Sequence, residues 1–208
     1  MNPHVLQAEI RACRACPHGS TRTQTIFAKG DPLSSLCFVG EAPGEEEDAQ
    51  GIPFVGNSGK LLDKQIAAMR EYAAALGVAF PADPYVCNVL KCRPPSNKLL
   101  KDGSDIVACS EHLWAQLRTL PNLRVIVALG KTAAQTLLGT GCQISVLRMR
   151  MHRGQPGGFN FLLMDQQPQR GAKIITTYHP AYLLRQPNNK TLSNEVWADL
   201  KLAVEALR

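Results

Sequence analysis

Four short apolar runs, spread along the chain, constrain the fold of this sequence more than any other feature. They are rich in Val, Ile or aromatic residues, which is typical of strands that are buried on both faces of a sheet. The runs cover residues 36–40, 85–90, 124–129 and 173–177. Helical patterns follow them, over about residues 58–77, 104–117, 131–139 and 193–207. Strands that alternate with helices predict an α/β fold with three α/β/α layers and a central four-stranded parallel sheet.

Length and composition agree with a globular protein. The 208 residues are enough to bury a sizeable core, and we expect a single domain over residues 1–208. Hydrophobic residues make up 45% and charged residues 19%, a balance that argues against a disordered chain. No apolar stretch approaches the ~20 residues of a membrane-spanning helix, and the first residues do not resemble a secretory signal. We therefore expect a cytoplasmic monomer with no membrane contact.

The net charge of +6 permits a polyanionic partner but does not require one. Chemically active side chains follow three of the predicted strands. Glu41 comes directly after the first run, Asn88 lies near the end of the second, and His179 follows the last. Because ligands bind beyond the carboxyl ends of parallel strands, we expect these residues to meet at one rim of the sheet.

A loop near this rim has the sequence GIPFVGNSGK over residues 51–60. Its glycine spacing matches a phosphate-binding loop as far as Gly56. Asn57 then stands where that motif needs Lys followed by Ser or Thr, so we reject a phosphate-binding loop. What remains is Phe54, an aromatic side chain in a stiff loop, which is a suitable platform for stacking a base.

Four segments together resemble the family 4 uracil-DNA glycosylases, the iron–sulfur members of the uracil-DNA glycosylase superfamily. They occur in the order of that family and are GEAPGE at 40–45, PFVG at 53–56, NVLKCRPP at 88–95 and HPAYLLR at 179–185. The resemblance covers nearly the whole chain and is weakest over residues 141–171. It implies a DNA repair enzyme that flips uracil out of single- or double-stranded DNA and hydrolyses its N-glycosidic bond, leaving an abasic site.

Two strand-end residues would handle the base. A lone Asn88 in a strand is more often a buried amide, but its donor and acceptor also match O4 and N3–H of uracil. Cytosine presents the reverse pattern, so Asn88 discriminates only if its amide orientation is fixed. A lone His179 is more often a turn residue. The resemblance makes it a donor near O2, where a neutral imidazole would stabilise the negative charge left on the base.

Glu41, Ala42 and Glu47 would complete the substrate site. A carboxylate near the sugar would stabilise its developing positive charge and activate water, and Glu41 is the candidate by elimination. Better-known relatives carry an acidic or amide residue that handles the water at the position of Ala42, so the residue that orients the water is left open. Glu47 resembles the family residue that blocks the thymine methyl group, and a solvated acid is an equally good interpretation.

The segment AYLLR over residues 181–185 combines apolar side chains with a cation. A packed helix start would explain it. The resemblance implies instead a DNA-binding wedge, in which Leu183 fills the gap left by the flipped base and Arg185 meets a phosphate.

Seven cysteines in a chain without a recognisable secretory signal favour metal ligation or burial over disulfides. Cys13 and Cys16 have the spacing that lets two thiolates reach one metal. Spacing alone does not separate zinc from an iron–sulfur cluster. The resemblance implies a structural [4Fe–4S] cluster, with Cys92 and Cys109 as the other two ligands.

Cys87 is the rival of Cys92 for the third position. In an extended strand the two side chains would point to opposite faces, and Cys92 is preferred because it follows the strand. Cys37 and Cys142 are expected to be packed thiols.

Two other functions compete with the glycosylase hypothesis. A damage-binding module with a dead site would not need the constellation of Glu41, Phe54, Asn88 and His179. A capture protein that bonds covalently to the DNA sugar would carry a basic, histidine-containing insertion after the third cysteine. Residues 93–100 (RPPSNKLL) contain no histidine, so we rank this function last.

Overall fold

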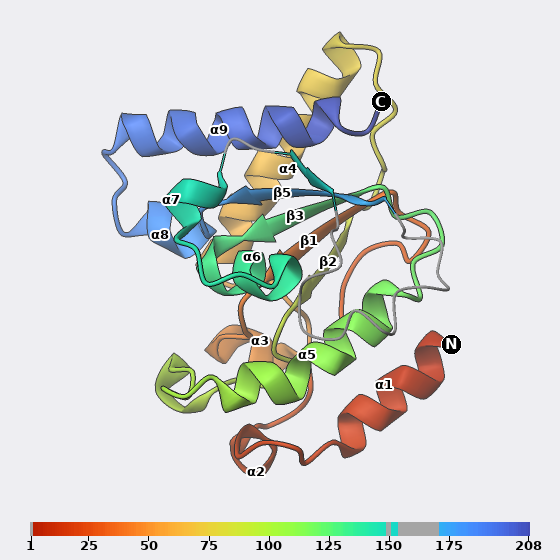
Figure 1. Cartoon of the computed structure of the whole chain (residues 1–208), viewed down its shortest axis with the longest axis vertical. Coiled ribbons are helices and arrows are strands. Elements are labelled where there is room, and N and C mark those ends of the chain that lie inside the picture. Colours follow the sequence, from red (N-terminus) through yellow and green to blue (C-terminus); the bar gives the residue numbers. More distant parts are fainter. Residues whose placement is uncertain (1, 149–150, 154–170) are drawn as a thin grey trace.

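The computed structural model describes residues 2–148, 151–153 and 171–208, with a sheet at its centre (Figure 1). Four neighbouring strands of this sheet run parallel, in the order β2 (Tyr85–Asn88), β1 (Leu36–Gly40), β3 (Val125–Leu129) and β5 (Lys173–Thr177). The predicted four-stranded parallel sheet is therefore confirmed.

A further strand, β4 (Met151–Arg153), pairs antiparallel with β5 at the edge of the sheet. The sequence does not predict it, because three residues are too few to show a strand periodicity. The sequence also predicts a short strand over residues 159–164, within a loop insertion rich in Gly and Gln, and these residues lie outside the described part of the chain.

Strand β2 ends at Asn88, earlier than the sequence predicts. Beyond it, the N–H groups of Val89 and Leu90 donate to the carbonyls of Gly40 and Glu41, at 2.9 and 3.0 Å. The chain therefore continues beside the loop that follows β1, and this pairing keeps the two loops together at the rim of the sheet.

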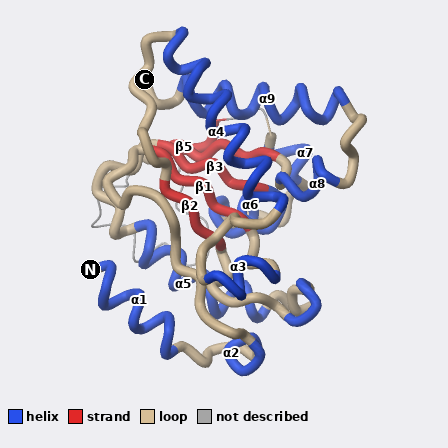
Figure 2. The backbone as a smooth tube through the Cα atoms, turned by 180° about the vertical axis from the view of Figure 1, so that it is seen from behind, coloured by secondary structure: helices blue, strands red, loops and turns tan. Residues whose placement is uncertain are grey.

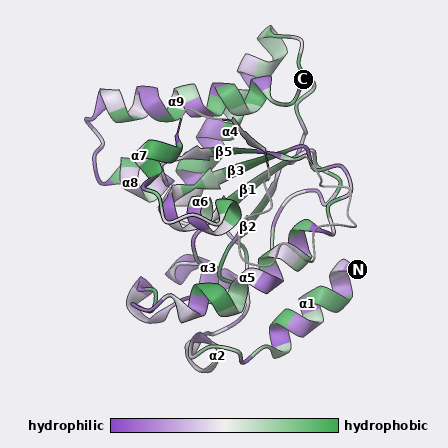
Figure 3. Cartoon of the chain, in the orientation of Figure 1, coloured by the Kyte–Doolittle hydropathy of each residue, from purple (hydrophilic) through white to green (hydrophobic). Residues whose placement is uncertain are grey.

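Helices cover both faces of the sheet (Figure 1 and Figure 2). One face is covered by α4 (Asn57–Ala75) and α9 (Lys190–Glu205), and the other by α5 (Ser104–Leu117) and α6 (Gly130–Leu138). Successive strand side chains point to opposite faces. Phe38 accordingly joins the core under α4 and α9, whereas Val39 joins the core under α5 and α6. Bands of apolar and polar residues alternate along α9, as an amphipathic helix requires (Figure 3).

The main helices begin and end near the predicted positions. Gly77 and Gly139 follow the C-terminal ends of α4 and α6 with φ of +63° and +61°, the left-handed conformation that stops a helix. Helix α9 begins at Lys190, earlier than expected. The side chain of Asn189 caps it by accepting the N–H of Leu192 at 3.0 Å.

The sequence predicts no bounds for the remaining short elements, although a helix start is one interpretation of the segment that forms the last of them. They are α1 (Pro3–Ala12), α2 (His18–Thr21), α3 (Glu45–Gln50), the 3₁₀ turn η1 (Pro95–Asn97), α7 (Ile144–Leu147) and α8 (Pro180–Leu184). Helix α1 lies beside α5, and Leu6 and Ile10 pack there against Ala115 (Figure 1). His18 Nε2 lies 2.8 Å from Asp105 Oδ2, and this buried pair ties α2 to the start of α5. Within the described ranges, no helix is long and apolar enough to span a membrane.

Candidate active site

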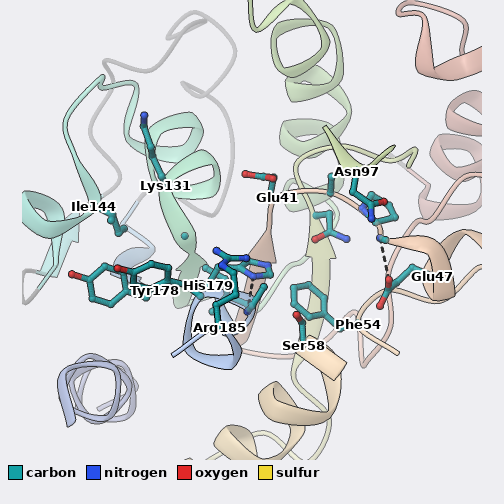
Figure 4. A pocket seen from close by; sticks show the side chains of 18 of the residues that line it. Glu41, Glu47, Phe54, Ser58, Asn97, Lys131, Ile144, Tyr178, His179 and Arg185 are labelled. Carbon is teal, nitrogen blue, oxygen red and sulfur yellow. Dashed lines mark hydrogen bonds between the residues drawn. The ribbon is translucent and has the colours of Figure 1, made fainter. Parts of the chain in front are cut away.

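A pocket of about 810 Å³ opens at the carboxyl ends of the parallel strands (Figure 4). Its lining includes most of the residues that the sequence proposes for the substrate, namely Glu41, Ala42, Glu47, Phe54, Asn88, His179 and Arg185. The structure thus brings these residues together, as we expect of residues at the carboxyl ends of parallel strands. Their chemical roles stay predictions.

Asn88 ends β2, and its side chain is almost fully buried. Its Oδ1 has no hydrogen-bond partner among the described residues. Leaving a buried acceptor unpaired costs about 1–3 kcal/mol, so this oxygen is prepared for a donor on a ligand. Gly40 makes room for it, because a Cβ there would lie 2.5 Å from both Asn88 Oδ1 and Phe54 Cζ. Glycine at the end of β1 therefore lets the amide and the ring lie side by side.

Phe54 has its backbone in the left-handed region, with φ of +54°, which is uncommon for a residue with a side chain. Its carbonyl accepts a hydrogen bond from Lys29 Nζ at 2.9 Å. The same carbonyl lies so close to Gly59 that a Cβ there would be 2.0 Å away. The Phe54 ring centre is 5.9 Å from the ring centre of His179, with the planes tilted by 30°. The loop thus holds its aromatic ring firmly at the pocket.

The Glu47 carboxylate accepts three backbone hydrogen bonds. Oε2 accepts from the N–H of Gly44 at 3.0 Å, and Oε1 accepts from the N–H groups of Val55 and Gly56 at 2.9 Å each. The side chain is buried, so the interpretation of Glu47 as a solvated acid is wrong. Glu47 instead joins the loop after β1 to the loop that carries Phe54.

His179 caps α8, because its Nδ1 accepts the N–H of Ala181 at 3.1 Å. The proton of the neutral ring must then be on Nε2, which leaves an N–H donor for a ligand. Burial, with a smaller contribution from the charge of Arg185, lowers the pKa of His179 to about 4. The imidazole is therefore neutral at pH 7, as the sequence-based hypothesis requires of a donor near uracil O2.

Glu41 lies at the same pocket, and its Oε2 accepts a hydrogen bond from the hydroxyl of Thr132 in α6. Sequence reasoning missed Thr132, because a threonine in the first turn of a helix carries no signal that it will face a residue 91 positions away. The bond restricts the Glu41 carboxylate. Ala42, with its methyl side chain, has no polar group that could orient a water molecule.

A separate cavity contains the four predicted metal ligands, Cys13, Cys16, Cys92 and Cys109. The sulfurs of Cys92 and Cys109 accept hydrogen bonds from residues that are distant from them in the sequence. Arg22 Nη1 donates to Cys92 Sγ at 3.1 Å, and the N–H of Lys91 donates to Cys109 Sγ at 3.3 Å. Burial raises the pKa of Cys109 to about 11. Such a thiol becomes a thiolate when a bound metal takes up its charge.

Among the described residues, no group of three or more His, Cys, Asp or Glu side chains is arranged to hold a single metal ion. The four sulfurs nevertheless line one cavity, and four thiolates suit either a tetrahedral zinc or an iron–sulfur cluster. Cys37 and Cys87 lie elsewhere, fully buried in the sheet core. Cys142 is exposed, which corrects the expectation that it is a packed thiol: it follows the end of α6 in a surface loop.

Comparison with known proteins agrees with this geometry. A sequence model of the Uracil DNA glycosylase superfamily matches residues 27–201. A type-4 uracil-DNA glycosylase from Thermotoga maritima is 37% identical over 89% of this chain and 85% of its own length. Relatives of the same name from Archaeoglobus fulgidus and Saccharolobus solfataricus are 34% and 30% identical, over 93% and 99% of this chain and 87% and 88% of their own lengths. This chain belongs to the type-4 uracil-DNA glycosylases. The predicted family is therefore confirmed.

One buried cation of this glycosylase connects the pocket with the cysteine cavity. Lys91 is 1% exposed, and its Nζ donates to the backbone carbonyl of Asn88 and to Gln116 Oε1. Gln116 in turn donates to the Tyr85 hydroxyl at 2.9 Å. Because the Lys91 N–H also donates to Cys109, a single residue contacts both sites. The sequence does not indicate that Lys91 is buried, since lysine side chains are mostly exposed.

The turn proposed to contact DNA is α8. Leu183, the predicted wedge, is partly buried and packs against the core under α4 and α9. Its neighbours Tyr182 and Leu184 are 38% and 44% exposed. Arg185 is exposed at the edge of the pocket (Figure 4). The most accessible apolar side chain of this glycosylase turn is therefore Leu184.

Proposed function

We propose that this type-4 glycosylase binds uracil of DNA in the pocket at the strand ends and hydrolyses its N-glycosidic bond, releasing uracil and leaving an abasic site. One observation carries this proposal. The buried Asn88 Oδ1 lacks a partner and lies beside the Phe54 ring, in a pocket that also contains His179. A ligand that supplies an N–H donor on a flat ring complements this arrangement, and uracil does so at N3. The names of the relatives support the same substrate.

The first step is recognition of a flipped base. Phe54 stacks on the uracil ring, while the Asn88 amide accepts N3–H and donates to O4. Cytosine would place its N4 donor against the Asn88 donor, which opposes binding. Glu47 acts through the loops that it joins: by holding Gly44 against Val55 and Gly56, it keeps the wall of the pocket where a thymine methyl group would need space.

Cleavage breaks the bond between N1 of the base and C1′ of the sugar, and the electron pair stays on the uracil ring. The Nε2–H group of His179 donates to O2 and stabilises this negative charge without transferring its proton. The Glu41 carboxylate stabilises the positive charge that develops on the sugar and accepts the proton of the water that adds to C1′. Thr132 is a positioning residue that fixes the Glu41 carboxylate for both tasks.

The surface around α8 binds the DNA strand. Arg185 pairs with a phosphate, and the apolar turn enters the stack in place of the flipped base. The family pattern assigns the wedge to Leu183. The exposure of Leu184 supports its participation, with Leu183 as the packed base of the turn.

Cys13, Cys16, Cys92 and Cys109 hold a [4Fe–4S] cluster, which supplies four metal–thiolate bonds that cross-link the segments around it. The shared cavity supports this assignment. The role is structural, because hydrolysis transfers no electrons. The cluster fastens the N-terminal segment to the loop after β2 and to α5.

Base release from matched oligonucleotides tests the proposed function. Uracil, thymine, cytosine or hypoxanthine is placed in one sequence context, in single and double strands, and free base and abasic sites are measured. We expect release of uracil and no release of thymine or cytosine. Binding without release would instead support a damage-binding module, and a covalent adduct would support a capture protein.

A further inference from the structure

The pocket has a second, aromatic end that recognition of uracil leaves unused. Figure 4 shows Phe54 and Glu47 on one side, Tyr178 and Ile144 on the other, and His179 and Arg185 between them. Tyr182 also lines the pocket, and its ring centre lies 5.3 Å from that of Tyr178, with the planes tilted by 35°. This spacing is that of an interacting aromatic pair.

The inner ring of this pair is anchored from behind. The guanidinium of Arg148 lies 4.5 Å from the ring centre of Tyr178. Arg148 is itself buried and held by Asp199 and Glu195, through N···O contacts of 2.7 and 3.1 Å. Tyr178 is therefore held by a cation whose position is fixed by two carboxylates of the C-terminal helix α9. A ring held in this way can receive a partner without losing side-chain freedom.

The outer ring is accessible. Tyr182 is 38% exposed, and the guanidinium of Arg185 lies 5.8 Å from its ring centre. An exposed aromatic ring beside a cation, next to a binding pocket, has the composition of sites that stack bases of single-stranded nucleic acid. The whole pocket, at about 810 Å³, is near the top of the range for ligands much larger than one pyrimidine base.

From these observations we infer that Tyr178 and Tyr182 form a stacking site for the nucleobase next to the flipped uracil in the same strand. The inference rests on the proposed function, because the uracil in the Phe54 end sets where its neighbour lies. Every base has a π face, so the site accepts any of the four bases. In a single strand the neighbouring base is free to leave its stack, whereas in a duplex it stays paired. The site therefore contributes most to excision from single-stranded DNA.

The test compares single-stranded oligonucleotides in which the nucleotide on one side of the uracil carries a base or is a stable abasic analogue. Both the 5′ and the 3′ neighbour are tested, at substrate concentrations well below KM. For the wild-type enzyme we expect kcat/KM to be about tenfold higher with the base than with the abasic analogue, on one of the two sides. This ratio, rather than the absolute rate, reports the stacking.

Three variants locate the effect. Tyr182→Ala should bring the ratio close to one, and Tyr182→Leu should do the same, because an apolar side chain without a π face replaces the ring. Tyr182→Phe should keep the ratio of the wild type. The thermal unfolding midpoint of each variant shows that the protein is folded.

Two results would overturn the stacking site: a wild-type ratio of one on both sides, or an unchanged ratio in Tyr182→Ala. In both cases uracil is still released, so the proposed function stands. Absence of uracil release from every substrate would contradict the proposed function instead.

Discussion

The base pocket and the cysteine cavity meet at the end of β2, yet they are built in opposite ways. The pocket gathers the ends of parallel strands and leaves a buried polar atom, Asn88 Oδ1, without a partner among the described residues. The cysteine cavity gathers segments that are far apart in the sequence, and N–H donors point at its sulfurs. The pocket is thus suited to the reversible binding of an uncharged ring. The cavity offers N–H donors to sulfurs that we propose to be metal-bound thiolates.

The two regions are joined by Lys91, which lies three residues after Asn88 and next to Cys92. This arrangement suggests that changes on the cysteine side disturb folding first, whereas changes in the pocket disturb catalysis alone. Variants on the two sides test that division.

Cys109→Ser should have the largest effect, because it removes a thiolate from the centre of the cavity. Anaerobically purified wild-type protein should contain iron, and the variant should lose most of it together with much of its soluble yield. Metal analysis and the thermal unfolding midpoint measure both. Cys142→Ser, at an exposed cysteine, is the matched control and should keep its iron. One zinc and no iron in the wild type would contradict the account.

Lys91→Met should affect both regions. It removes the donor to the Asn88 carbonyl and to Gln116 Oε1, and each buried acceptor left unpaired costs about 1–3 kcal/mol. We expect a lower unfolding midpoint and also a lower kcat/KM for uracil, because the end of β2 is released. Lys98→Met, at an exposed lysine, should change neither. A less stable variant with the wild-type kcat/KM would show that Lys91 supports the fold without positioning Asn88.

Thr132→Val should affect the pocket alone. A hydrogen bond to a charged group contributes about 1.5–3 kcal/mol, so the single-turnover rate should fall about tenfold or more while substrate binding changes little. Thr132→Ser keeps the hydroxyl and should recover most of the rate. Equal rates for wild type and Thr132→Val would remove Thr132 from the positioning of Glu41.

The smallest expected change is in the rate of the enzyme as the pH falls below neutrality. Burial lowers the pKa of His179 to about 4, so the rate of the folded enzyme should not fall as pH drops through 6.5. In the unfolded chain the imidazole has its ordinary pKa and takes up its proton first. His179 therefore lowers stability as pH falls from about 6.5 toward 4, and His179→Gln should weaken this dependence. A His-dependent loss of rate with a midpoint near 6.5 would show that the imidazole is not buried.

The difference between the base pocket and the cysteine cavity also explains which features can be predicted from the sequence. The positions of the strands follow from the apolar runs in the sequence. The geometry of parallel sheets then predicts that Glu41, Asn88 and His179 meet at one rim. The four cysteines could be grouped only through the family resemblance, since spacing alone supports Cys13 and Cys16.

Other features depend on packing that no local pattern records. Thr132 meets Glu41, and Lys91 turns inward, because of how whole elements dock. Glu47 reads as one of several acids in a row, and only the fold shows that backbone N–H groups surround it. Likewise, the turn of α8 decides that Leu183 packs inward while Leu184 is exposed.

Asn88→Asp tests whether the Asn88 amide recognises the base. The substitution keeps the shape of the side chain but replaces the donor to uracil O4 with a second acceptor. The activation free energy of uracil excision should rise by about 2–4 kcal/mol, so the single-turnover rate should fall about 30-fold to several hundredfold. Excision of cytosine, if it is gained, should appear mainly at low pH, where N3 of cytosine is protonated. Excision of uracil at the wild-type rate would contradict the account, because Asn88 would then be only a buried strand residue.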